Sequence, residues 1–196
     1  MVAPVTRPLL RAIGAAQAWL DELGIPAAIV GGIAASLLGR PRVTKDVDLV
    51  ALVPESEWPR LLEAGRRLGF EPRAADALAF ARLSRVLLLK HAPTQIELDL
   101  SFAGLPFEVE VIERATAHTV RGTTFRVASP EDIVVMKALA LRPRDIADIE
   151  AIIELHPELD LARIRGLLKA FTEALETDDF AAEFERILVR SRTKRT

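Results

Sequence analysis

The chain has 196 residues, half of them hydrophobic, which is enough to bury a core in one domain or in a core domain with a small helical annex. Its 26 Lys and Arg residues nearly balance 28 Asp and Glu residues, and a net charge of −2 argues neither for nor against a nucleic-acid partner. The absence of cysteine excludes a disulfide framework and a thiolate zinc site. No apolar run approaches the roughly 20 residues of a membrane span, and the N-terminus lacks a signal-peptide layout. We therefore expect a cytoplasmic protein with no membrane partner.

The first third of the chain alternates helix and strand signals. Apolar residues recur at helical spacing after Arg7, and Gly24 ends that pattern. A short apolar strand then runs into the Gly31-Gly32 pair, and a short helix carries the chain away from it. The helices expected here are residues 7–23, 33–38 and 54–68, and the strands are 27–30 and 47–53.

The middle of the chain is rich in strand signals separated by turns that contain Pro, Gly and Thr. The strands expected here are residues 78–83, 86–90, 95–101, 107–112 and 124–128. From Ser129 the pattern becomes helical, because Ser129 suits a helix cap and Pro130 suits the first helical position. The helices expected after this point are residues 130–140, about 147–155, 161–175 and 180–189.

These patterns predict an α/β (α+β) protein with a small mixed β-sheet flanked by helices. We expect a core at residues 1–128, a C-terminal helical region at 129–190 that packs on the core, and a basic tail at 191–196.

Asp46-Val47-Asp48 opens the second strand and follows a basic loop that contains Arg40, Arg42 and Lys45. Alternate residues of a strand point the same way, so Asp46 and Asp48 project together. Two close carboxylates repel each other unless a cation lies between them, and hard cations take oxygen ligands. The stretch therefore predicts a metal and phosphate site at the end of a strand.

Glu97 and Asp99 occupy one face of a later strand, opposite its apolar residues. If that strand lies beside the Asp46 strand, Asp99 becomes a third carboxylate facing the same site. Three acids suit two-metal phosphoryl transfer, in which two hold magnesium on a triphosphate and the third helps to activate the attacking hydroxyl. The alternative is that Glu97 and Asp99 form the solvated face of an edge strand.

Ile29-Val30-Gly31-Gly32, a spacer, Asp46-Val47-Asp48-Leu49 and a later carboxylate together resemble the DNA polymerase β-like nucleotidyltransferase superfamily. A closer resemblance, to the AbiEii-type toxin nucleotidyltransferases, rests on Arg42-Val43-Thr44 before the acids. It also rests on the segment from Pro130 to Lys137, which is followed by an Asp-containing turn. The resemblance covers roughly residues 27 to 155.

The resemblance implies a role for each matching residue. Gly31 and Gly32 would let the backbone approach the triphosphate. The implied catalytic residues are Asp46, Asp48, Asp99 and Lys137, of which the three aspartates would bind Mg2+ (or Mn2+) and Lys137 would contact a phosphate. Residues implied to bind the nucleotide, besides the two glycines, are Arg42, Thr44, Lys45, Asp145 and Asp148. Lys137 also lies beside the apolar face of its helix, where a lysine can simply extend to solvent, and the two later aspartates can serve the helix dipole instead.

The resemblance further implies transfer of a nucleoside monophosphate from an NTP to an acceptor hydroxyl. A tRNA or protein acceptor is favoured, with the chain as the toxin of a toxin–antitoxin or phage-defence system. Three alternatives are open: a small-molecule acceptor such as an aminoglycoside, a non-catalytic antitoxin or binding module that neutralises a partner protein, and a structural helix–sheet protein whose acids are only solvated.

Overall fold

The computed structural model describes residues 5–176 and 179–193, which form two structural units. The first unit contains the residues up to Ala34 and Arg42–Ala128, and the second contains Ala35–Pro41 and the residues from Ser129 onward. The second unit thus takes up the short segment 35–41 from early in the chain, which the sequence pattern did not suggest. Of the basic tail expected at 191–196, residues 194–196 lie outside the described residues.

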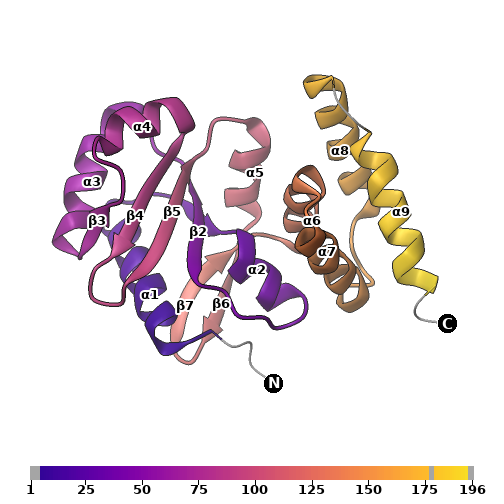
Figure 1. Cartoon of the computed structure of the whole chain (residues 1–196), viewed down its shortest axis with the longest axis horizontal. Coiled ribbons are helices and arrows are strands. Elements are labelled where there is room, and N and C mark those ends of the chain that lie inside the picture. The colour runs from indigo at the N-terminus through magenta and orange to yellow at the C-terminus, as the bar shows by residue number, and fades with distance from the viewer. Residues whose placement is uncertain (1–4, 177–178, 194–196) are drawn as a thin grey trace. The chain divides into compact units, whose positions relative to one another are not determined.

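One mixed sheet forms the centre of the first unit. Among the described residues it has seven strands, in the order β3 (Phe70–Pro72), β4 (Val86–His91), β5 (Ile96–Phe102), β2 (Asp46–Ala51), β1 (Ala27–Ile29), β7 (Thr123–Val127) and β6 (Thr116–Val120). Strands β2 and β5 are parallel, as are β1 and β7, and the other neighbours are antiparallel (Figure 1). The expected fold class is therefore confirmed, although β3 and β6 were not expected.

Two buried tryptophans tie the helices of the first unit to its sheet. These helices are α1 (Arg7–Glu22), the short 3-10 helix η1 (Glu55–Glu57), α3 (Trp58–Arg67), α4 (Ala77–Ser84) and α5 (Pro106–Arg114), and α2 (Gly31–Leu38) begins in this unit. The Trp19 ring stacks on Phe70 at a centroid distance of 5.2 Å, and its indole N–H donates to the Leu61 carbonyl at 3.1 Å. Trp58 stacks on Phe102 at 4.0 Å. Both tryptophans therefore act as packing residues.

The expected strand at residues 78–83 is wrong, because this segment belongs to helix α4. The Asp76 side chain accepts a hydrogen bond from the Ala79 amide at 2.9 Å and caps the helix. Ala77 and Ala81, four residues apart, are the buried positions, whereas Leu83 is exposed. A helix cap and a burial period of four residues thus outweigh the apolar run that favoured a strand.

The expected strand at residues 107–112 is also wrong and is helix α5. The apolar residues Phe107, Val109 and Val111 alternate in sequence, but the structure buries Phe107, Val111 and Ile112. The Glu108 carboxylate accepts hydrogen bonds from the Gly104 and Leu105 amides at 2.6 and 2.9 Å. This capping satisfies the first free amides of the helix and so favours a helix over a strand.

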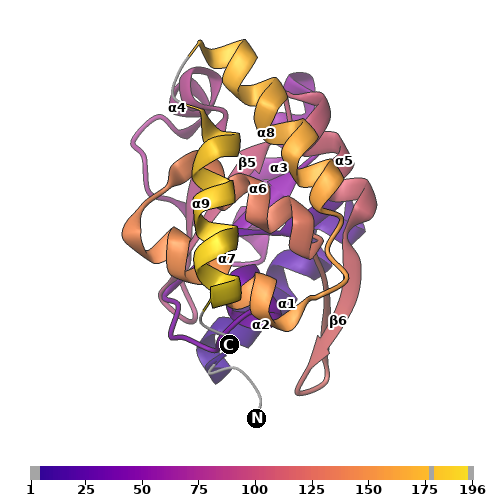
Figure 2. The ribbon, with the colours of Figure 1, turned by 90° about the vertical axis from the view of Figure 1, so that its right-hand side faces the viewer.

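The second unit is helical in its described residues, as expected. Its helices are α6 (Pro130–Ala140), α7 (Pro143–Leu155), α8 (Leu161–Leu175) and α9 (Phe180–Thr193). Ser129 caps α6, since its side chain accepts from the Asp132 amide at 3.2 Å. Helix α6 packs against α7 and α8, and α9 packs beside α7 and α8 (Figure 2).

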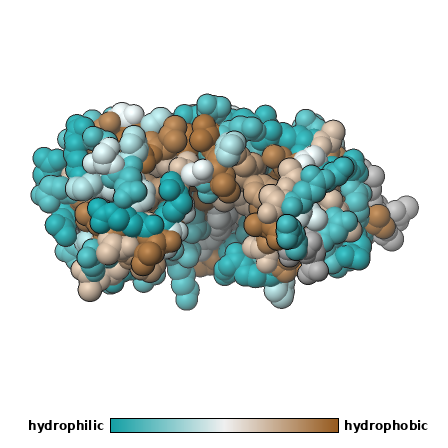
Figure 3. All heavy atoms as spheres, turned by 90° about the horizontal axis from the view of Figure 1, so that it is seen from above, coloured by the Kyte–Doolittle hydropathy of each residue, from teal (hydrophilic) through white to brown (hydrophobic). Residues whose placement is uncertain are grey.

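The face shown in Figure 3 mixes hydrophilic and hydrophobic residues. Over the described part of the chain, no helix combines the length and the apolar character needed to cross a bilayer.

Gly65 of α3 offers a test of the packing around Trp19. A Cβ atom at Gly65 would lie 2.7 Å from Cζ2 of the buried Trp19 ring. We expect Gly65→Ala to lower the free energy of unfolding by about 1–3 kcal/mol through overpacking, although alanine is the better helix former. Gly166 of α8 has open space around its Cβ position, so Gly166→Ala is the control and is expected to raise stability by about 0.5–1 kcal/mol. Urea unfolding followed by circular dichroism measures the free energy of unfolding of both variants. An equal increase in the two variants would contradict the close packing of Gly65 against Trp19.

Candidate active site

Asp46 and Asp48 lie on one face of β2, as the alternation predicts. Asp46 is exposed and Asp48 partly buried, whereas Val47 and Leu49 between and after them are fully buried. The two carboxylates therefore leave the core on the same side of the sheet, at the first residues of the strand.

The start of α2 lies directly against Asp48. Gly31 has a φ of +61°, and a Cβ atom at this position would lie 2.0 Å from the Asp48 Oδ2 atom. The Gly32 amide donates to the same oxygen at 3.3 Å, and the Val30 amide donates to the Asp48 carbonyl at 3.0 Å. Only glycine fits at position 31, because both its backbone conformation and the nearby carboxylate exclude a side chain.

Arg42 and Thr44 lie against the same helix start. A Cβ atom at Gly32 would be 3.0 Å from Thr44 Cγ2 and 3.4 Å from Arg42 Nη2. Lys45 is an exposed residue of the same loop. The first amides of a helix and a nearby guanidinium are both suited to binding a phosphate group.

Asp99 lies beside Asp48 on the neighbouring strand. Strands β2 and β5 are parallel, and their register pairs Asp48 with Asp99 and Asp46 with Glu97. Glu97 and Asp99 are the outward-facing residues of β5, and Leu98 and Leu100 are buried. The structure thus brings acids from two strands to one face of the sheet, which we call the acidic face: Asp46, Asp48, Glu97 and Asp99.

Arg73 is a component of this face that the sequence did not reveal. It follows β3, and its guanidinium forms ion pairs with Asp99 and, at 2.9 Å, with Glu97. Its Nε atom also donates to the Leu89 carbonyl of β4 at 3.0 Å. No sequence signal could have found this contact, because β3 was not expected and the paired residues are 26 positions apart.

Burial raises the pKa of the Asp99 carboxyl above its ordinary value, and the negative charges of Asp46 and Glu97 act in the same direction. The Arg73 guanidinium opposes this shift without cancelling it.

The donor chemistry of the acidic face suits Mg2+ or Mn2+, which prefer carboxylate oxygens. Asp46, Asp48 and Asp99 would supply those oxygens. Within residues 5–176 and 179–193, no three His, Asp or Glu side chains converge as a metal-holding group, and Asp99 is paired with Arg73 instead.

Lys137, Asp145 and Asp148 form a buried cluster within the second unit. The Lys137 ammonium is 2.7 Å from Asp145 and 2.9 Å from Asp148, and all three side chains are nearly inaccessible. Arg142 reaches Asp145 at 2.5 Å from the partly exposed side. Burial would raise the pKa of Asp145, but hydrogen bonds from Arg142 and Lys137 hold that pKa below its ordinary value. This mutual pairing favours a structural role for the three residues.

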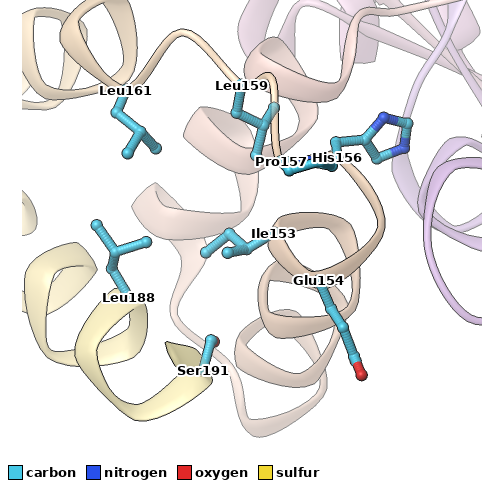
Figure 4. A pocket seen from close by; sticks show the side chains of 8 residues that line it. All are labelled: Ile153, Glu154, His156, Pro157, Leu159, Leu161, Leu188 and Ser191. Atoms are coloured by element: carbon cyan, nitrogen blue, oxygen red, sulfur yellow. The ribbon is translucent and has the colours of Figure 1, made fainter. Parts of the chain in front are cut away.

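A small hollow of about 100 Å³ also lies in the second unit (Figure 4). Ile153, Leu161 and Leu188 line it from three helices. His156 bonds to the Leu38 carbonyl at 2.8 Å and Glu154 to Arg40 at 2.5 Å, so these polar groups already have partners. The hollow offers no converging polar groups for a ligand.

A family model described as "Nucleotidyl transferase of unknown function (DUF2204)" matches residues 9–182. The chain therefore belongs to this family and is a nucleotidyltransferase. This confirms the nucleotidyltransferase resemblance, while the closer likeness to the AbiEii-type toxins stays a prediction. A comparison with the curated proteins gave no match.

Solved structures show the same fold. The solution structure of the antibiotic-resistance factor ANT(2'')-Ia is similar with a TM-score of 0.60 and 20% identity, over 85% of this chain and 92% of that one. The crystal structure of ANT(2'')-Ia in complex with adenylyl-2''-tobramycin is similar with a TM-score of 0.56 and 22% sequence identity. The similarity covers 85% of this chain and 98% of that one. The crystal structure of an antigenic nucleotidyltransferase-like protein from Paracoccidioides brasiliensis is similar with a TM-score of 0.54 and 22% sequence identity. The similarity covers 93% of this chain and 95% of that one.

Gly31→Ala tests whether the contact with Asp48 matters for activity. Because the new methyl group would displace the Asp48 carboxylate, we expect nucleotidyl transfer to fall by about 100-fold. Gly24 also has a positive φ, +65°, but open space around its Cβ position. Gly24→Ala is therefore the control: it is expected to lose about 1–2 kcal/mol of stability from the left-handed backbone and to keep its activity. Similar activities for the two variants would contradict the contact.

Lys137→Met tests the buried cluster. The substitution removes the buried ammonium that pairs with both Asp145 and Asp148, so we expect a loss of about 3–5 kcal/mol in the free energy of unfolding. Lys169→Met is the control, because Lys169 is 75% exposed and 3.8 Å from Glu173, and such a surface pair contributes about 0–1 kcal/mol.

The Lys137→Met deficit is expected to depend on pH. In the intact protein the pKa of Asp145 lies below its ordinary value of 3.8, so the stabilisation from its pairing is complete above pH 3.8 and is lost as the pH falls through the folded-state pKa. Thermal unfolding at a series of pH values is expected to show the gap between intact protein and variant narrowing below pH 3.8. A gap that does not change with pH would argue against the ion pairs.

Proposed function

We propose that this nucleotidyltransferase moves a nucleoside monophosphate from an NTP to an acceptor hydroxyl and releases pyrophosphate. The observation that carries the proposal is the register that pairs Asp48 with Asp99, with Gly31 directly against the Asp48 carboxylate. Acids from two strands and the start of a helix therefore meet on one face, which suits a triphosphate and its metal ions.

In this proposal the amides at the start of α2 and the Arg42 guanidinium bind triphosphate oxygens, with Thr44 and Lys45 beside the nucleotide. Asp46, Asp48 and Asp99 would hold Mg2+ or Mn2+. The metal, when bound, would neutralise negative charge on the triphosphate. The presence of Asp99 beside Asp48 supports a catalytic protein over a non-catalytic antitoxin.

The reaction is a displacement at the α-phosphorus of the NTP. The acceptor oxygen forms a bond to that phosphorus, the bond from the phosphorus to the bridging oxygen breaks, and pyrophosphate leaves with the electron pair. Asp99 takes the proton of the acceptor hydroxyl, so that the proton and charge balance is complete.

For the acceptor we propose a tRNA or protein hydroxyl, with the chain as the toxin of a toxin–antitoxin or phage-defence pair. The support is the match of Arg42-Val43-Thr44 and of the Lys137 segment to the AbiEii-type toxins. The resemblance also gives Lys137, Asp145 and Asp148 a place at the nucleotide, but their mutual pairing supports a structural role for them.

A second candidate acceptor is a small molecule of the aminoglycoside type. The observation that favours it is the fold match to ANT(2'')-Ia, whose crystal structure is described with adenylyl-2''-tobramycin. That acceptor is a property of ANT(2'')-Ia, and it is carried to this chain only as a proposal.

Labelled NTPs test the reaction and its acceptor together. The intact protein is incubated with each α-labelled NTP, magnesium, and total RNA, cell protein or an aminoglycoside panel. We expect Asp48→Asn to reduce labelling at least about 100-fold while keeping an oxygen for the Gly32 amide. Asp21→Asn, at an exposed residue of α1, is the control and is expected to label normally.

The labelled product identifies the acceptor class. Nuclease-sensitive label indicates RNA, protease-sensitive label indicates protein, and a labelled small molecule indicates the second candidate. If no NTP gives a labelled product with the intact protein, the transferase proposal fails and the non-catalytic binding module replaces it.

A further inference from the structure

The Arg73 side chain crosses one strand of the sheet to reach the acidic face. Arg73 follows β3, and strand β4 lies between β3 and β5. The Nε atom donates to the Leu89 carbonyl of β4 at 3.0 Å. The two terminal nitrogens then pair with Glu97, at 2.9 Å, and with Asp99 on β5.

This arrangement uses the particular geometry of a guanidinium. Its planar fork presents donors in fixed directions, so one nitrogen can be anchored to a backbone carbonyl while two others hold separate carboxylates. A lysine ammonium has no equivalent of the Nε anchor and would reach the acids as a mobile point charge. The Arg73 side chain is only 25% exposed, although it lies at the edge of the sheet.

An ordinary surface ion pair contributes little to stability, about 0–1 kcal/mol, and does not account for this placement. Arg73 is anchored to β4, and one of its partners is the strand neighbour of Asp48. It is also a counter-charge that pairs with Glu97 and Asp99, on a face where the negative charges of Asp46 and Glu97 act on Asp99.

We propose that Arg73 is a positioning residue for nucleotidyl transfer, which holds the Asp99 carboxylate on the acidic face beside Asp48. The inference rests on the proposed function, since it assigns Arg73 a role at the same site. By fixing Asp99 and Glu97 before any ligand binds, the guanidinium keeps the acids of β5 aligned with those of β2. Partners that orient a metal ligand in this way typically change metal affinity or activity by about 10–100-fold when they are removed.

Direct binding of Mn2+ to the full chain tests the proposal, with the free ion followed by electron paramagnetic resonance. Arg73→Met is expected to weaken Mn2+ binding by about 10–100-fold, and the magnesium concentration for half-maximal transfer is expected to rise by a similar factor. Arg73→Lys keeps the positive charge but loses the planar guanidinium fork. Its Mn2+ affinity is therefore expected to lie between those of the intact protein and Arg73→Met.

Arg82→Met is the matched control. Arg82 lies on α4 and pairs with Glu55 at 3.0 Å, so the same substitution removes an arginine ion pair without touching Asp99. We expect its Mn2+ affinity and its transfer activity to equal those of the intact protein. Thermal unfolding of each variant separates a loss of fold from a loss of metal binding.

The outcomes separate this inference from the proposed function. If the intact protein binds Mn2+ and Asp48→Asn abolishes the binding, but Arg73→Met binds as the intact protein does, then Arg73 is not a positioning residue. Tighter Mn2+ binding by Arg73→Met would also overturn the inference, because it would make Arg73 a competitor of the metal. If Asp48→Asn leaves Mn2+ binding unchanged, the proposed function itself fails.

Discussion

The contact between the Gly31 backbone and the Asp48 carboxylate is the constraint on which the acidic face depends. A positive φ and a hypothetical Cβ only 2.0 Å from Asp48 Oδ2 leave no alternative to glycine at this position. The contact fixes the start of α2 beside the first residues of β2, and the Gly32 amide then meets the same carboxylate. A backbone donor and a carboxylate of a type that can bind a metal therefore lie side by side.

The same face carries an electrostatic problem, because Asp46, Asp48, Glu97 and Asp99 project from neighbouring strands. Burial raises the pKa of Asp99, and the like charges of Asp46 and Glu97 act in the same direction. The Arg73 guanidinium offsets part of this repulsion, because it pairs with Glu97 and Asp99, the two acids of β5. Asp48 of β2 lies against the start of α2, whose backbone amides are suited to binding a phosphate group.

In the second unit, by contrast, neighbouring carboxylates are buried and paired with a buried lysine. Asp145 and Asp148 are buried, and both are bonded to the buried Lys137. A cluster closed in this way has its hydrogen bonds and charge satisfied from within, so breaking it destabilises the fold. Buried and mutually paired charges thus serve structure, whereas the partly exposed carboxylates of the acidic face remain accessible to a ligand.

The sequence by itself determined the fold class, most helices and strands, and the shared face of Asp46 and Asp48, because these depend on residue type and spacing along the chain. It predicted a turn at Gly31-Gly32, whereas helix α2 already begins at Gly31. It missed α4 and α5, where caps supplied by Asp76 and Glu108 outweighed an apolar or alternating pattern. Only the tertiary structure decided that β5 lies parallel to β2 with Asp99 beside Asp48, and that Arg73 pairs with Asp99. Strand register and contacts between residues 26 positions apart depend on how the chain folds back on itself, which local spacing does not encode.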